Sequence, residues 1–202
     1  MSFVRIISEE NQLALEAGKL VARDFMWITV RNRSNGAQQA FGFWSDIGNV
    51  SAEVINPNTG SAVTRTWEGA GSLIEMDDIP LVSNLQVQTI RIKMNQISSM
   101  VDTLIRTYDA KQAPIEIYRG MLNPATRQMV APALNRFIGF VDTIDWDTPE
   151  EGSEGGVYLN CVSHTQEMTR SNPDTRSHAS QLKRNATDAF YKDTAVVGRL
   201  VS

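Results

Sequence analysis

The stretch Leu85–Gly120 changes its hydrophobic period twice, and no other feature of the sequence constrains the fold as much. Within Ile90–Met94 apolar and basic residues alternate, which is typical of a β-strand with one face in water. Within Ile97–Ile105 apolar residues recur at spacings of three and four, as in the apolar stripe of a helix. Pro114 then opens a second alternating run. The stretch therefore predicts a strand, a short crossing helix and a second strand as one supersecondary unit.

Further alternating runs lie on both sides of this unit. Turn residues such as Asn35-Gly36 and the cluster Asn56–Gly60 separate them, which favours antiparallel hairpins. The expected strands are Asp24–Val30, Ala40–Trp44, Val50–Ile55, Ala62–Trp67, Arg136–Trp146 and Val157–Ser163. We therefore expect a mainly β (α+β) chain: an antiparallel β-barrel or sandwich with a central short helix and helical N- and C-terminal segments.

Composition divides the chain into three expected parts. Residues 1–22 predict an N-terminal helix capped by Ser8, residues 23–165 a β-barrel domain, and residues 166–202 a C-terminal helical arm. Large apolar residues are few from Ser171 onward, so we expect this arm to be mobile in a free monomer and to pack against a partner. Its expected anchors are Phe190, Tyr191, Val196, Val197 and Leu200.

The predicted core of the β domain consists of residues on the apolar phase of the alternating runs. Because the two faces of a strand alternate residue by residue, this phase assigns each side chain to the interior or to water. The residues expected to be buried are Ile90, Ile92, Ile115, Ile117, Ile138, Phe140, Leu159 and Cys161.

The totals argue against several classes of function. The 202 residues carry a net charge of −4, whereas general nucleic-acid binding needs a basic surface. Cys161 is the only cysteine, so neither an internal disulfide nor a cysteine-based zinc site is possible. No apolar run approaches the roughly 18–20 residues of a membrane span, and the N-terminus lacks the apolar core of a secretory signal. We expect a chain without a membrane span that is made and folded in a cytoplasm.

Two histidines and a group of carboxylates are the first candidates for chemistry. His164 is followed by Glu167, but neither it nor His178 has a third ligand at a metal-binding spacing, so structural histidines are expected. The carboxylates could bind calcium or act as a glycosidase-like pair, yet they lack the fixed spacing of a calcium loop, and a solvated acidic loop is expected instead. They are Asp142, Asp145, Asp147, Glu150, Glu151 and Glu154.

Cys161, Ser163 and His164 together suggest a nucleophile and its base. Adjacent residues of a strand point to opposite faces, so Ser163 and His164 cannot easily pair, and a core cysteine is expected. The sequence therefore predicts no enzyme and no catalytic, cofactor-binding or metal-binding residues.

Basic and aromatic residues indicate contact surfaces instead. The basic residues of the arm favour docking on an acidic protein surface over nucleic-acid binding, because few aromatic residues lie between them. They are Arg170, Arg176, Lys183, Arg184 and Lys192. Four tryptophans in predicted strands are expected to be core or interface anchors. They are Trp27, Trp44, Trp67 and Trp146.

Several stretches match the sequence pattern of one protein family. The first is the expected N-terminal helix that leads into a strand. The others are Gly42–Val50, Val63–Pro80, Leu85–Ser98, Leu104–Gly120, Phe137–Gly156 and, strongest of all, Val157–Gly198. Read in order, they resemble the tail hub (minor tail or baseplate hub) proteins of long-tailed bacteriophages, including those of lambda-like phages. These proteins follow the distal tail protein and precede the large tip protein.

The resemblance implies a structural virion protein of the phage tail tip or baseplate. Such hub proteins form a ring that joins the tail tube to the tip proteins and surrounds the DNA channel. It implies a homo-oligomer, with a trimer favoured and a hexamer possible, and the distal tail protein and tip or central fibre proteins as partners. DNA would pass through the ring without specific binding, and an acidic lining would suit this. The expected location is the virion, after assembly in the host cytoplasm.

The chain departs from larger hub proteins, whose additional Cys-rich domain holds an iron–sulfur cluster. With one cysteine, this chain is not expected to hold that cluster. The alternatives are a sixfold ring of a distal tail protein, a tail-associated peptidoglycan hydrolase acting through Asp145, and a carbohydrate-binding module that uses Trp67 or Trp146.

Overall fold

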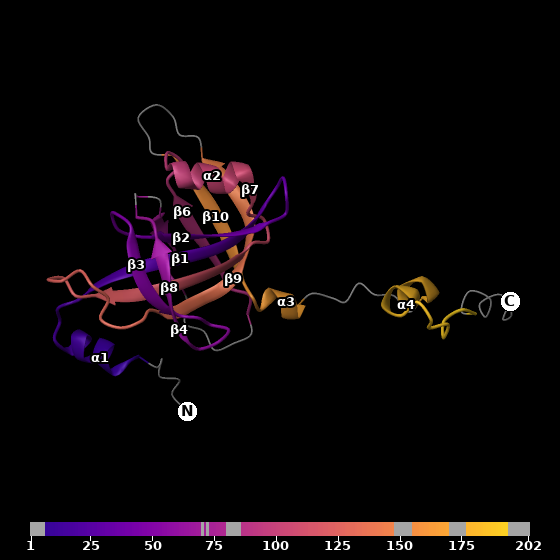
Figure 1. Ribbon diagram of the computed structural model, residues 1–202, viewed down its shortest axis with the longest axis horizontal. Helices are drawn as coiled ribbons and strands as arrows, with labels where there is room; N and C mark the ends of the chain where they lie inside the picture. The colour runs from indigo at the N-terminus through magenta and orange to yellow at the C-terminus, as the bar shows by residue number, and fades with distance from the viewer. Residues whose placement is uncertain are drawn as a thin grey trace. The chain divides into compact units, whose positions relative to one another are not determined.

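The computed structural model describes residues 7–69, 71, 73–79, 86–147, 155–169 and 177–193 (Figure 1). The chain divides into two compact units, Met1–Met168 and Thr169–Ser202. In chain order the elements are α1 (Glu9–Glu16), β1 (Val21–Asn32), β2 (Gln38–Trp44), β3 (Val50–Ile55), β4 (Ala62–Trp67), β5 (Leu73–Met76), β6 (Thr89–Met94), α2 (Ser99–Thr107), β7 (Tyr108–Asp109), β8 (Pro114–Leu122), β9 (Leu134–Asp147), β10 (Gly156–Ser163), α3 (Gln166–Thr169) and α4 (His178–Arg184).

Eight strands form one antiparallel sheet, which confirms the prediction of a mainly β, antiparallel fold. Seven of them follow the order β2-β1-β8-β9-β10-β6-β5, and β7 pairs with β1. β3 and β4 form a separate two-stranded hairpin. The predicted strand–helix–strand unit is present as β6, α2 and β8, but β9 and β10 lie between its two strands in the sheet. The architecture is consistent with a β-sandwich.

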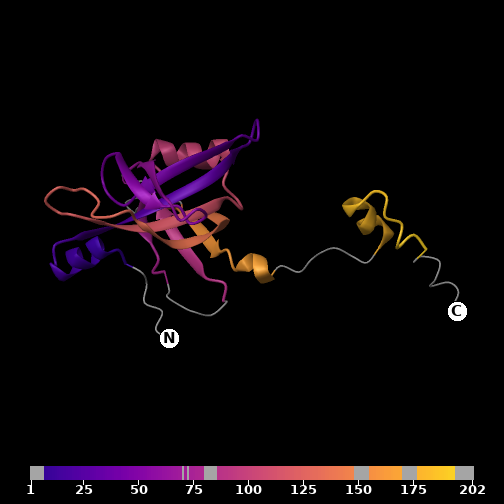
Figure 2. The ribbon, with the colours of Figure 1, turned by 60° about the horizontal axis from the view of Figure 1, so that its bottom comes forward.

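A first hydrophobic core lies between one face of the sheet and α2, which crosses that face in both ribbon views (Figures 1 and 2). Alternate residues of β1, such as Met26 and Ile28, point into it. The helical spacing predicted for α2 places Val101, Leu104 and Ile105 on the same core. Each such side chain contributes roughly 1.5–3 kcal/mol when it leaves water, so this core is the main source of the body's stability.

A second core lies on the opposite face of β1 and β8, under the β3–β4 hairpin. Trp67 of β4 is fully buried there and packs edge-to-face against Phe25, Trp27 and Tyr118, at centroid distances of 5.1, 5.4 and 6.2 Å. Backbone hydrogen bonds hold the hairpin in place: Glu68 bonds to β2 on one side, and Ala133 bonds to β3 on the other. The hairpin thus acts as a second layer over half of the sheet.

Arg65 fixes the position of this hairpin. Its Nη1 lies 2.6 Å from Oε2 of Glu116, and its guanidinium lies 4.5 Å from the ring centroid of Trp27. The hydroxyl of Tyr118 donates a hydrogen bond to the same Glu116 oxygen at 2.6 Å. Burial and the hydrogen bond with Glu116 raise the pKa of Tyr118, so the phenol stays protonated. Because desolvation offsets much of the attraction in such a pair, its main effect is to orient the hairpin.

Six of the eight predicted core residues are fully buried: Ile90, Ile92, Ile115, Ile117, Leu159 and Cys161. The prediction is wrong for Ile138, which is 39% exposed, and for Phe140, which is half-buried. Phe137 and Val141 face the core in their place. Apolar residues occupy both phases of this run, so alternation could not select the face. The register of β9 also shifts against β10 at Asp142, which changes the inward phase along the strand.

Replacing Ile92 by Ala is expected to lower the free energy of unfolding by about 2–4 kcal/mol, because the lost methyl groups leave a cavity in the first core. Chemical denaturation of the full chain measures this loss. Ile97→Ala is the matched control, since that isoleucine is 86% exposed and should change stability by less than about 0.5 kcal/mol. Equal losses in the two variants would show that Ile92 does not carry core packing.

The N-terminal helix is shorter than the expected residues 1–22. Ser8 caps it by accepting a hydrogen bond from the amide of Asn11 at 3.4 Å. The helix ends at Glu16 because Gly18 adopts a positive φ of 67°, a left-handed conformation that commonly terminates helices. β1 then begins at Val21. The residues before Ile7 lie outside the described part of the chain.

In the C-terminal unit the structure describes residues 177–193. α4 covers only part of the expected helical arm of residues 166–202 and contains no buried residue. Ser177 caps it by accepting a hydrogen bond from the amide of Ser180. Phe190 and Tyr191 form an edge-to-face ring pair at 5.0 Å, yet Phe190 remains 80% exposed. The other expected anchors, Val196, Val197 and Leu200, lie outside the described residues.

Candidate functional site

The two histidines lie in unrelated surroundings. Nε2 of the exposed His164 is 3.5 Å from Oε2 of Glu167, and its ring stacks on Phe140 at a centroid distance of 5.0 Å. Nδ1 of His178 is buried and has no hydrogen-bond partner within the described part of the chain. The described residues contain no group of three or more His, Cys, Asp or Glu side chains that could hold a metal ion. The possible metal pair of the sequence therefore has no third ligand in this part of the chain.

The carboxylate group lies on the exposed end of β9. Asp145 and Asp147 are exposed, and Asp142 is half-buried at the register shift. Oδ2 of Asp145 accepts a hydrogen bond from Nδ2 of Asn160 at 2.6 Å, so this carboxylate is tied to β10. Glu150, Glu151 and Glu154 lie outside the described residues, so the structure assembles no complete carboxylate site from this run.

Cys161 and Ser163 of the suspected nucleophile group each have contacts of their own. Cys161 is fully buried, and burial raises the pKa of its thiol to about 12, so the thiolate is not formed near neutral pH. The hydroxyl of Ser163 accepts a hydrogen bond from the amide of Gln88 at 3.0 Å and lies 2.5 Å from the hydroxyl of Thr165. These contacts give Cys161 a packing role and Ser163 the role of a link to the segment before β6.

Of the four tryptophans, only one is strongly exposed. Trp27, Trp44 and Trp67 belong to the second core, where Trp44 also donates a hydrogen bond from Nε1 to the carbonyl of Gly48 at 2.7 Å. Trp146 is 50% exposed near the end of β9. Trp67 therefore cannot present its ring to a carbohydrate, and Trp146 is the one tryptophan that can.

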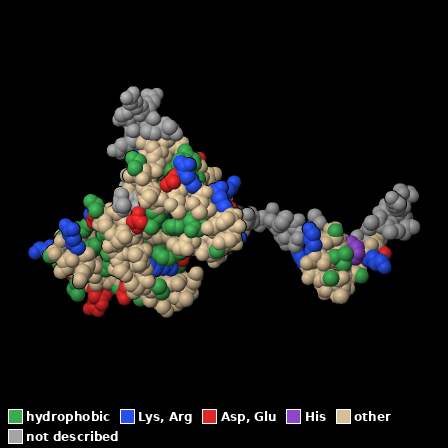
Figure 3. All heavy atoms as spheres, turned by 45° about the horizontal axis from the view of Figure 1, so that its top comes forward, with side chains coloured by type: hydrophobic (Ala, Val, Ile, Leu, Met, Phe, Trp, Pro, Cys, Tyr) green, Lys and Arg blue, Asp and Glu red, His purple; other side chains and the backbone are tan. Residues whose placement is uncertain are grey.

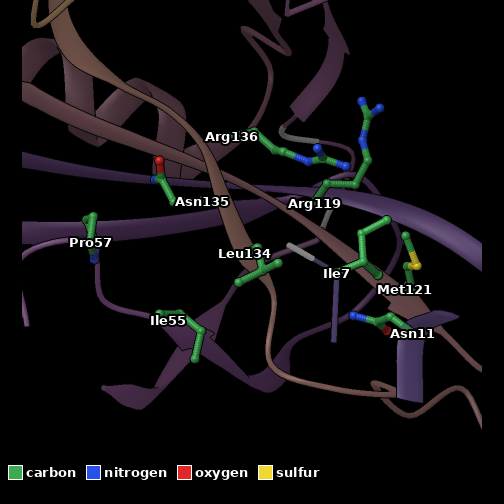
Figure 4. A pocket seen from close by; sticks show the side chains of 9 residues that line it. All are labelled: Ile7, Asn11, Ile55, Pro57, Arg119, Met121, Leu134, Asn135 and Arg136. Atoms are coloured by element: carbon green, nitrogen blue, oxygen red, sulfur yellow. The ribbon is translucent and has the colours of Figure 1, made fainter. Parts of the chain in front are cut away.

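A pocket of about 320 Å³ lies where α1, the end of β3, β8 and the start of β9 meet (Figure 4). Ile7, Asn11 and Met121 are grouped to one side of Leu134, and Ile55 lies to the other (Figure 4). The described residues that line it are Ile7, Asn11, Ile55, Pro57, Arg119, Met121, Leu134, Asn135 and Arg136. The walls thus combine an apolar surface with two arginines and two amides.

Asn11 is the polar group buried most deeply in this pocket. The residue is 6% exposed, and its Oδ1 has no hydrogen-bond partner among the residues that the structure describes. On α1 Asn11 is the buried residue, whereas Leu13 and Leu15 are exposed. An unpaired buried acceptor costs about 1–3 kcal/mol, so the atom would gain from a donor supplied by another molecule.

The two arginines differ in their partners. Arg119 forms a bidentate pair with Asp24, with distances of 2.7 Å from Nε to Oδ1 and 3.2 Å from Nη2 to Oδ2, and this hydrogen bonding raises the pKa of Arg119. Arg136 forms no ion pair within the described residues. It is the extra residue in the register shift between β8 and β9, and its side chain extends towards Arg119 (Figure 4). An unpaired guanidinium beside a paired one favours an incoming anion.

A second hollow, of about 500 Å³, contains its own counter-charge. Its lining includes Arg23 and Asp46, whose Nε and Oδ2 atoms are 2.8 Å apart, together with Arg127. The hydrogen bond from Arg23 lowers the pKa of Asp46, so this carboxylate stays ionised and satisfies the cation beside it. This hollow therefore has less need of an external anion than the pocket beside α1.

Sequence reasoning did not find the pocket beside α1. Asn11, Arg119 and Arg136 come from three distant segments, and no local motif links them. The sequence carried no signal for it, because a buried Asn11 beside exposed Leu13 and Leu15 is the reverse of what the polarity of these residues predicts.

No protein-family model matches this sequence. A search of curated proteins also found no match. Among the described residues, no helix is both long and apolar enough to cross a membrane.

Proposed function

We propose that this chain is a structural protein of a bacteriophage tail tip or baseplate, a ring-forming hub subunit that joins the tail tube to the tip proteins. The stretches that resemble phage tail hub proteins, of which Val157–Gly198 is the strongest, support this proposal. A ring subunit needs a rigid β body and segments that reach its neighbours. The β1–β2 turn and the loop between β8 and β9 project from opposite sides of the body in both ribbon views (Figures 1 and 2).

The observation that carries the proposal is the C-terminal unit. α4 has no buried residue, and Leu182 and Phe190 are 40% and 80% exposed. Hydrophobic and basic side chains lie beside each other on this unit (Figure 3). Apolar side chains that remain in water within so short a segment are typical of an arm that becomes ordered on a partner.

Charge indicates what kind of partner the arm would take. Thr169–Ser202 contains six Lys and Arg residues and three Asp residues, a net charge of +3, which leaves −7 on Met1–Met168. A basic arm on an acidic body favours docking on an acidic protein surface, and a second copy of this chain offers such a surface. The proposed assembly is therefore a homo-oligomeric ring.

Electron microscopy of the purified full chain, together with its mass in solution, tests this function. We expect closed rings, with threefold symmetry for a hub. Sixfold averages would instead favour a distal tail protein ring, the alternative within the same class. A protein that stays monomeric at micromolar concentration, and is absent from purified tails, would overturn the structural proposal.

Trp146 favours carbohydrate binding as a second candidate function. The half-exposed ring of Trp146, near the end of β9, offers a flat apolar face, which suits a sugar ring. A glycan array probed with the full chain and with Trp146→Ala separates the two candidates. Specific glycan binding that is lost in the variant would favour this second function, and an empty array would remove it.

A further inference from the structure

We propose that the pocket beside α1 binds an acidic peptide segment of a partner protein. In this arrangement a carboxylate side chain of the peptide pairs with Arg136, and a backbone N–H donates to Oδ1 of Asn11. The inference goes beyond ring assembly, because it concerns one pocket on the body and does not involve the C-terminal unit.

The charge of the pocket favours an anionic ligand. Among the described residues its lining contains Arg119 and Arg136 and no acidic residue, although the body as a whole carries −7. Asp24 already occupies Nε and Nη2 of Arg119, whereas Arg136 forms no ion pair within the described part of the chain. Arginine and carboxylate form planar, charge-assisted hydrogen bonds, so Arg136 is the group that selects the acid.

The remaining walls separate a peptide from a simple anion. Asn11 offers a buried acceptor and therefore needs a donor. Five of the nine lining residues are apolar: Ile7, Ile55, Pro57, Met121 and Leu134. An inorganic anion would leave this apolar wall uncovered. A peptide supplies a carboxylate, an N–H group and an apolar side chain within one short segment, and about 320 Å³ lies at the small end of ligand pockets.

Positional pools of acetylated, amidated hexapeptides test the proposal on the full chain. In each fluorescent pool one position is fixed as Glu, Gln or Lys and the others vary. Fluorescence anisotropy should show that Glu pools bind at least tenfold tighter than Gln or Lys pools. Arg136→Gln should abolish this preference, and Asn11→Leu should weaken the Glu pools about tenfold. Arg127→Gln, an exposed arginine outside this pocket, is the matched control and should retain the full preference.

Two results would overturn the proposal. One is equal binding of the Glu and Gln pools, or a Glu preference that persists in Arg136→Gln. The other is that inorganic phosphate displaces the peptide completely and binds as tightly as the peptide does, which would make the pocket a small-anion site. Thermal unfolding of each variant shows whether the fold is intact, and a variant that fails to fold is replaced by Arg136→Lys, which should retain part of the preference.

Discussion

Trp67→Ala is expected to lower the free energy of unfolding of the body by about 3–5 kcal/mol. The side chain is fully buried, and its ring contacts Phe25, Trp27 and Tyr118. Its removal leaves a large cavity between the β3–β4 hairpin and the sheet, because hairpin and sheet are both held by backbone hydrogen bonds and cannot close the gap fully. Urea denaturation followed by circular dichroism measures the loss.

Trp146→Ala is the matched control for this experiment. The same side chain is removed, but it is 50% exposed, so the expected change is less than about 1 kcal/mol. Similar losses in the two variants would mean that the hairpin does not cover the sheet as a second core. Unfolding of Trp67→Ala in two separate steps would mean that the hairpin layer opens on its own.

Removal of the C-terminal unit is expected to abolish incorporation into tails and to leave the body folded. A chain that ends at Met168 retains every residue of the two cores, whereas it loses the exposed apolar side chains of Leu182 and Phe190. We expect an unchanged denaturation midpoint of the body and at least a tenfold lower content of the chain in purified tails. Quantitative mass spectrometry of the particles measures this content.

The single substitution Phe190→Ser should reproduce most of that assembly defect in the full chain. Ile97→Ser is its control, because Ile97 has a similar exposure of 86% but lies on the body. Hydrogen exchange of a dilute monomer gives an independent check. Protection of residues 177–193 equal to that of β9 would contradict an arm that becomes ordered only on a partner.

The strand pattern of this fold could be predicted because the alternation is local. Ile90 and Ile92 face the core as their period indicates, and the turn at Asn35-Gly36 joins β1 to β2 as expected. The failure at Ile138 and Phe140 has a physical reason. Apolar residues filled both phases of that run, and the register shifts of β9 depend on its two neighbouring strands, which sequence alternation does not contain.

The second core and the pocket could not be predicted from local patterns. In β4 Val63 is exposed, although Trp67, four residues later, is buried. The sequence of this strand therefore does not indicate that β4 packs over the sheet as part of a second layer. The pocket depends on Arg136, which extends into it from an extra residue in a register shift. Both features arise when distant segments meet, and a single sequence carries no local signal for such meetings.

β1 belongs to both cores, and this has a consequence for how the chain acquires its structure during synthesis. Met26 and Ile28 line the first core and Phe25 the second, while Val21–Ile28 of β1 pair with β8, which is made some ninety residues later. The first core also needs β10, near the end of the body. Such distant pairings delay folding, because the intervening chain must be ordered first. Every residue of the second core has therefore been made once Ala133 is added, whereas the first core stays unfinished until β10 has left the ribosome.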